Sequence, residues 1–230
     1  MRLDKFLSNL KYGSRNDIKK MCKNNLIKVN GEIINKSDIN IDPNKDIVEV
    51  SDNKVYYKEN ITLIINKPSG YICSNVDEIY PSLLRLLDEQ YSRFDFKFAG
   101  RLDWDTEGLV VVSTDGEIVH KITSPKKDMY KTYYVKSKYP LNNIETLTQP
   151  IVLLDGKNNE YTTKGAKITK LSDFELLLSI TEGKFHQVKR MLEHISNEVV
   201  YLKRIQIGNL SLPENLMSGE FLEIDPNCIF

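Results

Sequence analysis

The sequence predicts an α+β fold in two parts: a small unit of two helices and a β-hairpin over residues 1–58, and a larger, largely antiparallel α+β domain over residues 59–230. A chain of 230 residues, 40% of them hydrophobic, is comfortably long for a small domain followed by a larger one. Helical spacing and a hairpin signal dominate the beginning of the chain. Farther along, strand-like runs outnumber helices and do not alternate with them, which argues against a parallel sheet.

Local sequence signals predict each helix and strand of the first unit. Residues 2–10 predict an amphipathic helix, because their apolar side chains recur at helical spacing. Ser14 is suited to cap a second helix whose lysines stay in water. Asn30-Gly31 lies between two apolar runs and is the strongest short signal for a β-hairpin. A strand-like DIVEV and a polar linker close the unit.

The second unit reads as strands mixed with short helices. Helices are predicted over residues 82–90, 115–123, 143–148 and 185–195. The predicted strands are ITLIINK, FDFKFAG, GLVVVST, KTYYVKS, KGAKITKL, FELLLSIT, VVYLKRIQI and GEFLEI. Many strands with few crossover helices favour an antiparallel sheet.

Charge is distributed unevenly along the chain. Lysine and arginine balance aspartate and glutamate at 32 each, yet residues 1–36 hold nine basic residues against three acids. Such an asymmetry suggests a basic module that meets nucleic acid or an anionic membrane. The three cysteines have neither disulfide nor zinc spacing, and no run resembles a signal peptide or a membrane span. We therefore expect a cytoplasmic protein without a membrane partner.

The segment MRLDKFLSNLKYGSRNDIKKMCKNNLIKVNG resembles the small RNA-binding domain named after ribosomal protein S-four. That domain lays two short helices and a β-hairpin against structured RNA. A solvated helix face is the alternative for lysines on a helix. The resemblance extends through helices, turn and hairpin and implies that the following residues contact RNA: Arg2, Lys5, Arg15, Lys19 and Lys20.

The stretch DWDTEG sets three acids at alternate positions before Gly108 and resembles half of a calcium-binding loop. The twelfth position of such a loop needs a bidentate glutamate, and here it is Thr114. The intervening LVVVST suits a strand. A calcium site is therefore not expected, which leaves a polar turn or an active-site loop.

Three segments together, GRLDWDTEGL, YKTYYV and EGKFHQVKRM, resemble the catalytic motifs of pseudouridine synthases of the RsuA type. NKPSGYICS, HKITSP and the order of all segments extend the resemblance over nearly the whole chain. The family detaches uracil from its ribose, turns the ring over and rejoins it through a ring carbon. This isomerisation is redox neutral, so the resemblance implies neither a cofactor nor a metal.

The resemblance also implies the catalytic residues. Asp103 of GRLD is expected to act as nucleophile at the anomeric carbon or as base on its neighbour, with the first step left open. Lys189 is its expected cationic partner, since a dry pocket would otherwise favour the protonated acid. Tyr133 is expected to pack on the target base, with adjacent Tyr134 on the opposite face of the strand. We expect the remaining acids of the loop, Asp105 and Glu107, to shape the turn.

Further contacts follow from basic and aromatic residues. Arg101 could fill the stack vacated by the flipped uridine or grip phosphate. Residues 121–138 interleave six lysines, Lys126 and Lys127 among them, with tyrosines, which suits unstacked RNA. His186 precedes a helix, where a lone histidine is more often a packing or capping residue than an acid or base.

The choice of substrate depends on finer features. KTY, NKPSGYICS and the spacing to Pro81 look closer to the enzymes for small-subunit 16S rRNA, the position-516 type, than to those for large-subunit 23S rRNA. The large-subunit enzyme of the same family stays an alternative. So does a non-catalytic ribosome-assembly factor, although the presence of Asp103 argues against it. We expect a monomer acting on ribosomal RNA or an assembly intermediate; the exact uridine stays open.

Overall fold

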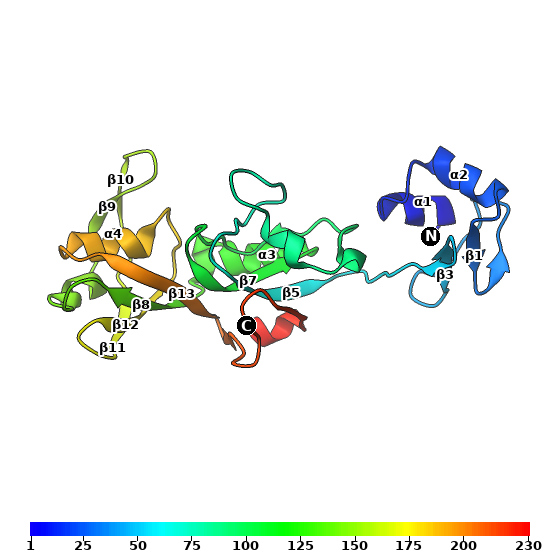
Figure 1. The fold of residues 1–230 in the computed structure, drawn as a ribbon. Coiled ribbons are helices and arrows are strands. Elements are labelled where there is room, and N and C mark those ends of the chain that lie inside the picture. Colours follow the sequence, from blue (N-terminus) through cyan, green and yellow to red (C-terminus); the bar gives the residue numbers. More distant parts are fainter. The chain divides into compact units, whose positions relative to one another are not determined.

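The computed structural model describes residues 1–230, which form two compact units (Figure 1). The first comprises Met1–Asn60 together with Asp88–Asp95, and the second comprises Ile61–Leu87 together with Phe96–Phe230. The sequence predicts one continuous second domain from residue 59. In the structure, the segment Asp88–Asp95 of that region belongs to the first unit instead.

The first unit is a helical hairpin on a small antiparallel sheet of strand order β2-β1-β3-β4. Its elements are α1 (Leu3–Asn9), α2 (Arg15–Lys23), β1 (Ile27–Val29), β2 (Glu32–Ile33), β3 (Val48–Val50) and β4 (Asn53–Lys54). Ser14 caps α2 in a reciprocal capping box with Asp17. Asn30 and Gly31 both take positive φ, as a tight hairpin turn between β1 and β2 requires. The predicted helices and hairpin are confirmed.

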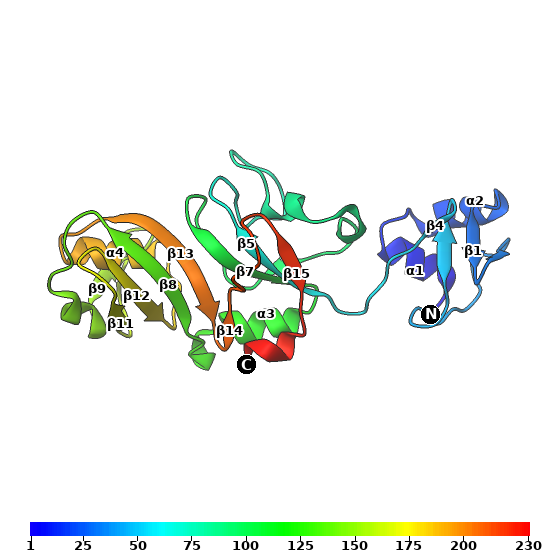
Figure 2. The same ribbon diagram turned by 60° about the horizontal axis from the view of Figure 1, so that its bottom comes forward.

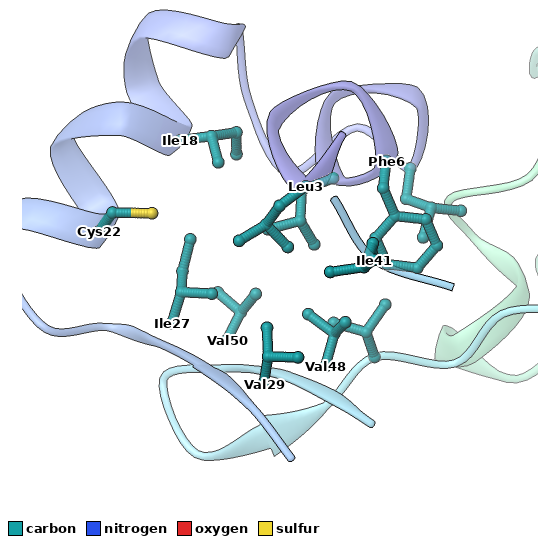
Figure 3. Close-up of a cluster of buried hydrophobic side chains, with 12 residues drawn as sticks. Leu3, Phe6, Ile18, Cys22, Ile27, Val29, Ile41, Val48 and Val50 are labelled. Atoms are coloured by element: carbon teal, nitrogen blue, oxygen red, sulfur yellow. The ribbon is translucent and has the colours of Figure 1, made fainter. Parts of the chain in front are cut away.

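The core of the first unit lies between the helices and the sheet (Figure 3). Apolar side chains from α1 and α2 face those of the strands across this layer. The labelled members are Leu3, Phe6, Ile18, Cys22, Ile27, Val29, Ile41, Val48 and Val50. The outer helix faces keep the lysines in water, so burial and charge separate as the helical spacing predicts.

The second unit is built on a nine-stranded sheet with the main order β11-β12-β8-β13-β7-β5-β15. Two short strands extend it, β14 on β13 and β6 on β7. The strands are β5 (Thr62–Lys67), β6 (Lys97–Phe98), β7 (Glu107–Ser113), β8 (Lys131–Ser137), β11 (Lys167–Lys170), β12 (Glu175–Ile180), β13 (Val199–Ile207), β14 (Leu210–Ser211) and β15 (Phe221–Glu223). Neighbouring strands run antiparallel except β13 and β7. The predicted α+β class with a largely antiparallel sheet is confirmed.

Two α-helices accompany this sheet, α3 (Gly116–Thr123) and α4 (Gln187–His194). Asp115 caps α3 by accepting a hydrogen bond from the N–H of Glu117. Figure 2 shows α4 beside the neighbouring strands β12, β8 and β13. The apolar face of α4 is buried, as its spacing predicts.

Several local predictions are wrong. The helix expected over residues 82–90 is two 3₁₀ turns, because Leu87 between them is extended. Residues 143–148 form a 3₁₀ turn rather than an α-helix. A hairpin of β9 (Val152–Leu154) and β10 (Glu160–Thr162) has no counterpart among the predicted elements. The 3₁₀ segments are η1 (Leu83–Leu86), η2 (Glu89–Tyr91), η3 (Pro125–Lys127), η4 (Ile144–Thr148) and η5 (Pro226–Ile229).

Gly108 permits the one parallel contact of the sheet. It lies opposite Arg204 where β7 meets β13, and its φ is 100°. A Cβ at this position would lie 2.2 Å from the carbonyl oxygen of Arg204. Any other residue would therefore push the two strands apart and strain its own backbone.

We predict that Gly108→Ala destabilises the second unit much more than Gly70→Ala. Gly70 also has positive φ, at 88°, but nothing lies within 4 Å of its missing Cβ. Its alanine variant carries only left-handed strain, about 1–2 kcal/mol, and the clash at Gly108 should bring roughly twice that or more. Urea unfolding of both variants measures the difference. Equal losses of stability would show that the strand crossing tolerates a side chain.

Candidate active site

Two buried cations hold the loop that joins β6 to β7, residues 100–106, which we call the site loop. Lys67, at the end of β5, is fully buried, and its Nζ donates to the carbonyls of Pro68 (3.0 Å), Trp104 (3.1 Å) and Thr106 (2.7 Å). Arg204 in β13 is 1% exposed. The Arg204 guanidinium donates to the carbonyls of Leu109 (2.8 Å) and Gly100 (3.0 Å). Carbonyls at both ends of the site loop are thus satisfied by charged donors.

The site loop, β8 and α4 together line a pocket. Asp103 reaches it from the loop, Tyr133 from β8 and Lys189 from α4. The Tyr133 side chain is buried, at 6% exposure, while Asp103 and Lys189 are partly exposed. The structure therefore brings together the three residues predicted for catalysis, although they lie far apart in the chain.

The pairing of Lys189 differs from the prediction. Its Nζ donates to both carboxylate oxygens of Asp105, at 2.8 Å each, and lies 3.6 Å from Oδ2 of Asp103. Asp105 is thus more than a turn residue, because it takes the hydrogen bonds expected for Asp103. Burial alone would raise the pKa of Asp105, but the hydrogen bonds and charge of Lys189 outweigh it and lower that pKa. Asp103 faces the same cation without a hydrogen bond to it.

Tyr134 and Glu107 both have hydrogen-bond partners outside the pocket. Tyr134 points away from the pocket, as predicted, and its hydroxyl donates to Glu175 at 2.6 Å. Glu107 accepts a hydrogen bond of 2.7 Å from the hydroxyl of Tyr201. Asp103 and Asp105 share Lys189, whereas Glu107 pairs with Tyr201, and no group of three potential ligands gathers to hold a metal ion.

His186 is closer to Asp103 than its sequence position indicates. It is the N-cap residue of α4, yet its side chain makes no capping hydrogen bond. Its Nε2 lies 3.5 Å from Oδ2 of Asp103, and its ring stacks on Phe185 with centroids 3.7 Å apart. Of the two roles expected for this histidine, capping is wrong and packing is confirmed by the stack on Phe185, and the imidazole also borders the pocket.

Gln187 adds a polar donor that the sequence reasoning missed. Its side chain is 3% exposed and lines the pocket. Its Oε1 accepts the N–H of Lys184 at 3.0 Å, which orients the amide, while Nε2 has no hydrogen-bond partner. The signal was present in the HQVK segment, but periodicity cannot tell a buried amide from a surface one. A carboxylate, an aromatic ring and an unpaired amide donor suit a neutral polar ring that offers acceptors.

Of the residues predicted to contact RNA, only Arg101 lies at the pocket. Arg2 is engaged with buried Asp4, to which it donates two hydrogen bonds, of 3.1 and 2.6 Å. That pairing lowers the pKa of Asp4, because Arg2 bonds to its charged form. The other predicted contacts are exposed and do not line the pocket: Lys5, Arg15, Lys19, Lys20, Lys126 and Lys127. None of the helices has the length and apolar character needed to cross a membrane.

Comparisons with known proteins match both units. A family model described as RNA pseudouridylate synthase matches residues 61–194, and an S4 domain model matches residues 1–47. An uncharacterized RNA pseudouridine synthase of Bacillus subtilis is 37% identical, over 97% of this chain and 95% of its own. The ribosomal small subunit pseudouridine synthase A of Haemophilus influenzae is 37% identical, over 96% and 94%. A crystal structure of a pseudouridylate synthase superposes with a TM-score of 0.69 at 35% identity, covering 100% of this chain and 98% of that one.

The ionisation of Lys67, one of the two buried cations that hold the site loop, should make the stability of the fold depend on pH. Burial lowers its pKa from 10.5 to about 8, although Cys73 and the nearby acids oppose the shift. Between about pH 8 and pH 10.5, Lys67 keeps its proton in the unfolded chain but has lost it in the folded chain. Over this range, Lys67 therefore makes the free energy of unfolding rise with pH.

We therefore predict that the unfolding free energy of wild type, minus that of Lys67→Met, increases from pH 7.5 to pH 10, because the variant lacks the titrating group. Urea unfolding at both values gives the difference. Lys131, whose pKa burial also lowers to about 8, is present in both proteins and cancels. Parallel pH profiles would mean that Lys67 does not titrate inside the fold as described.

Proposed function

We propose that this chain, which belongs to the family of RNA pseudouridine synthases, isomerises one uridine of small-subunit ribosomal RNA to pseudouridine. The observation that carries the proposal is the convergence of Asp103, Tyr133 and Lys189 in one pocket from three separate elements. The choice of the small subunit rests on relatives with that name, which match nearly the full chain at 34–37% identity.

The reaction breaks the bond between the uracil nitrogen and C1′ of the ribose and forms a bond from a ring carbon to C1′. The ring carbon then loses its proton, and the freed nitrogen gains one, so atoms and electrons balance. We propose that the Asp103 carboxylate starts the process, either as nucleophile at C1′ or as base on its neighbour. Both routes require the carboxylate to be ionised and unobstructed.

Lys189 and Asp105 support this state together. The ammonium lies 3.6 Å from Oδ2 of Asp103, within the distance of an ion pair. Its hydrogen bonds go to Asp105, so the lone pairs of Asp103 are not occupied by this lysine. Asp105 thus holds the Lys189 ammonium beside the carboxylate of Asp103, while the oxygens of Asp103 stay free of hydrogen bonds from this lysine.

Tyr133 supplies the surface against which the uracil would pack, with a hydroxyl suited to help remove the ring proton. Because its side chain is buried in the pocket, a uridine must leave its stack to reach it. Arg101, exposed at the pocket, is placed to occupy the vacated stack or to grip phosphate.

Exposed basic residues of the first unit would bind the surrounding RNA. Lys5, Arg15, Lys19 and Lys20 are the proposed phosphate contacts, while Arg2 is largely committed to Asp4. Lys126 and Lys127 on η3 provide a further basic segment in the second unit. We propose a monomer that acts in the cytoplasm and needs no cofactor, since the isomerisation is redox neutral.

Pseudouridine mapping of ribosomal RNA from cells with and without the gene tests the proposal. We expect one small-subunit pseudouridine, of the position-516 type, to disappear on deletion and to return with the wild-type gene. Both subunits are mapped in the same cells. A site lost from large-subunit RNA would make the chain the other enzyme type of its family, and no lost site would contradict a role in rRNA modification.

A further inference from the structure

An exposed aromatic stack stands beside the catalytic pocket. The rings of Trp104 and Tyr80 lie parallel, 4.7 Å apart with 5° between their planes. Trp104 directly follows Asp103 in the chain and is 46% exposed. A large ring left this open to water exposes apolar surface that a partner could cover.

Hydrogen bonds hold the backbone of Trp104 and the segment next to Tyr80. The carbonyl of Trp104 accepts hydrogen bonds from Lys67 Nζ at 3.1 Å and from the N–H of Gly70 at 2.8 Å. The segment that carries Tyr80 is braced by Asp77, which accepts the N–H of Ser82 at 2.8 Å. The backbone of Trp104 and the segment next to Tyr80 are therefore already held before a ligand arrives, which favours binding.

A wide cavity connects this stack to the catalytic pocket. It has a volume of about 600 Å³, and Trp104, Lys184 and Phe185 line it. It shares Arg101 and Asp103 with the catalytic pocket. A group in the wide cavity therefore lies next to whatever occupies the catalytic pocket, and the volume is that of a typical small-ligand site.

The chemistry around the cavity favours a nucleotide. Arg101 and Lys184 provide cations at its wall, and Trp104 and Phe185 provide rings. Aromatic rings bind unpaired bases by stacking, while cations follow the phosphates of the strand. Bases in an A-form duplex are already stacked and cannot use such a surface.

We propose that the Trp104–Tyr80 stack binds an unpaired base of the RNA adjoining the target uridine, with Arg101 and Lys184 on its phosphates. The inference rests on the proposed function in one respect, namely that the substrate is RNA. The stack acts on binding and makes no contact with the reacting atoms.

Intrinsic fluorescence of the full chain tests the contact directly, because Trp104 is the only tryptophan in the sequence. Titration with a single-stranded oligouridine should quench its emission saturably, and a blunt RNA duplex of equal length should quench it much less. Tyr80→Leu retains the fluorophore and should reduce the quench. Tyr139→Leu, which removes another exposed tyrosine, is the matched control and should leave it unchanged. Binding of the oligonucleotide without a quench would overturn the inference.

Kinetics provide a second readout. Trp104→Leu should raise KM for a small-subunit rRNA fragment by about 10- to 100-fold, the loss of one stacked base, with kcat retained. Trp104→Tyr should restore most of the affinity, because it returns a ring. An unchanged KM in folded Trp104→Leu would overturn the stack while leaving the proposed function intact. A wild-type chain that forms no pseudouridine would defeat the proposed function, and the fluorescence titration would still decide whether the stack binds RNA.

Discussion

The geometry of the proposed active site depends on two buried cations, Lys67 and Arg204, which bond to the backbone of the site loop. Lys67 and Arg204 have almost no solvent contact, and placing charge there is costly unless strong partners compensate. Their partners are chiefly backbone carbonyls of the site loop and the adjoining strand. Neither cation forms a salt bridge with a carboxylate, so the carbonyl groups are their main hydrogen-bond partners. The two cations therefore fix the position of the loop through its backbone, while the acids of the loop oppose the lowering of the Lys67 pKa.

The sheet explains how these cations reach the loop. Lys67 ends β5, Arg204 lies within β13, and β7 runs between these two strands, starting directly after the loop. The close approach of β7 to β13 at Gly108 keeps Arg204 beside the loop it holds. The helix α4 supplies Lys189 to the carboxylates of Asp103 and Asp105. A shift of any of these elements would change the charge around Asp103, which links the stability of the fold to the proposed chemistry.

Local patterns predicted much of the structure, and contacts between distant segments determined what they missed. Helical spacing, the Ser14 cap and Asn30-Gly31 act over a few residues, so the first unit is readable from its sequence. Alternation likewise predicts that Tyr133 and Tyr134 face opposite ways. The division of Lys189 between Asp103 and Asp105 depends on where α4 meets the loop, which no local pattern encodes. The role of Lys67 could not be predicted from the sequence either, because a lysine at the end of an apolar strand normally reaches solvent.

We propose that Asp103, rather than Asp105, carries the reaction, although Asp105 makes the closer contact with Lys189. Pseudouridine formation by Asp103→Asn and Asp105→Asn on one small-subunit rRNA substrate tests this claim most directly. Asp103→Asn removes the reactive charge and should form no product. Asp105→Asn keeps an amide oxygen that can accept one hydrogen bond from Lys189, so its rate should stay within about tenfold of wild type. Substantial product from folded Asp103→Asn, or an Asp105→Asn variant that alone is inactive, would contradict the account.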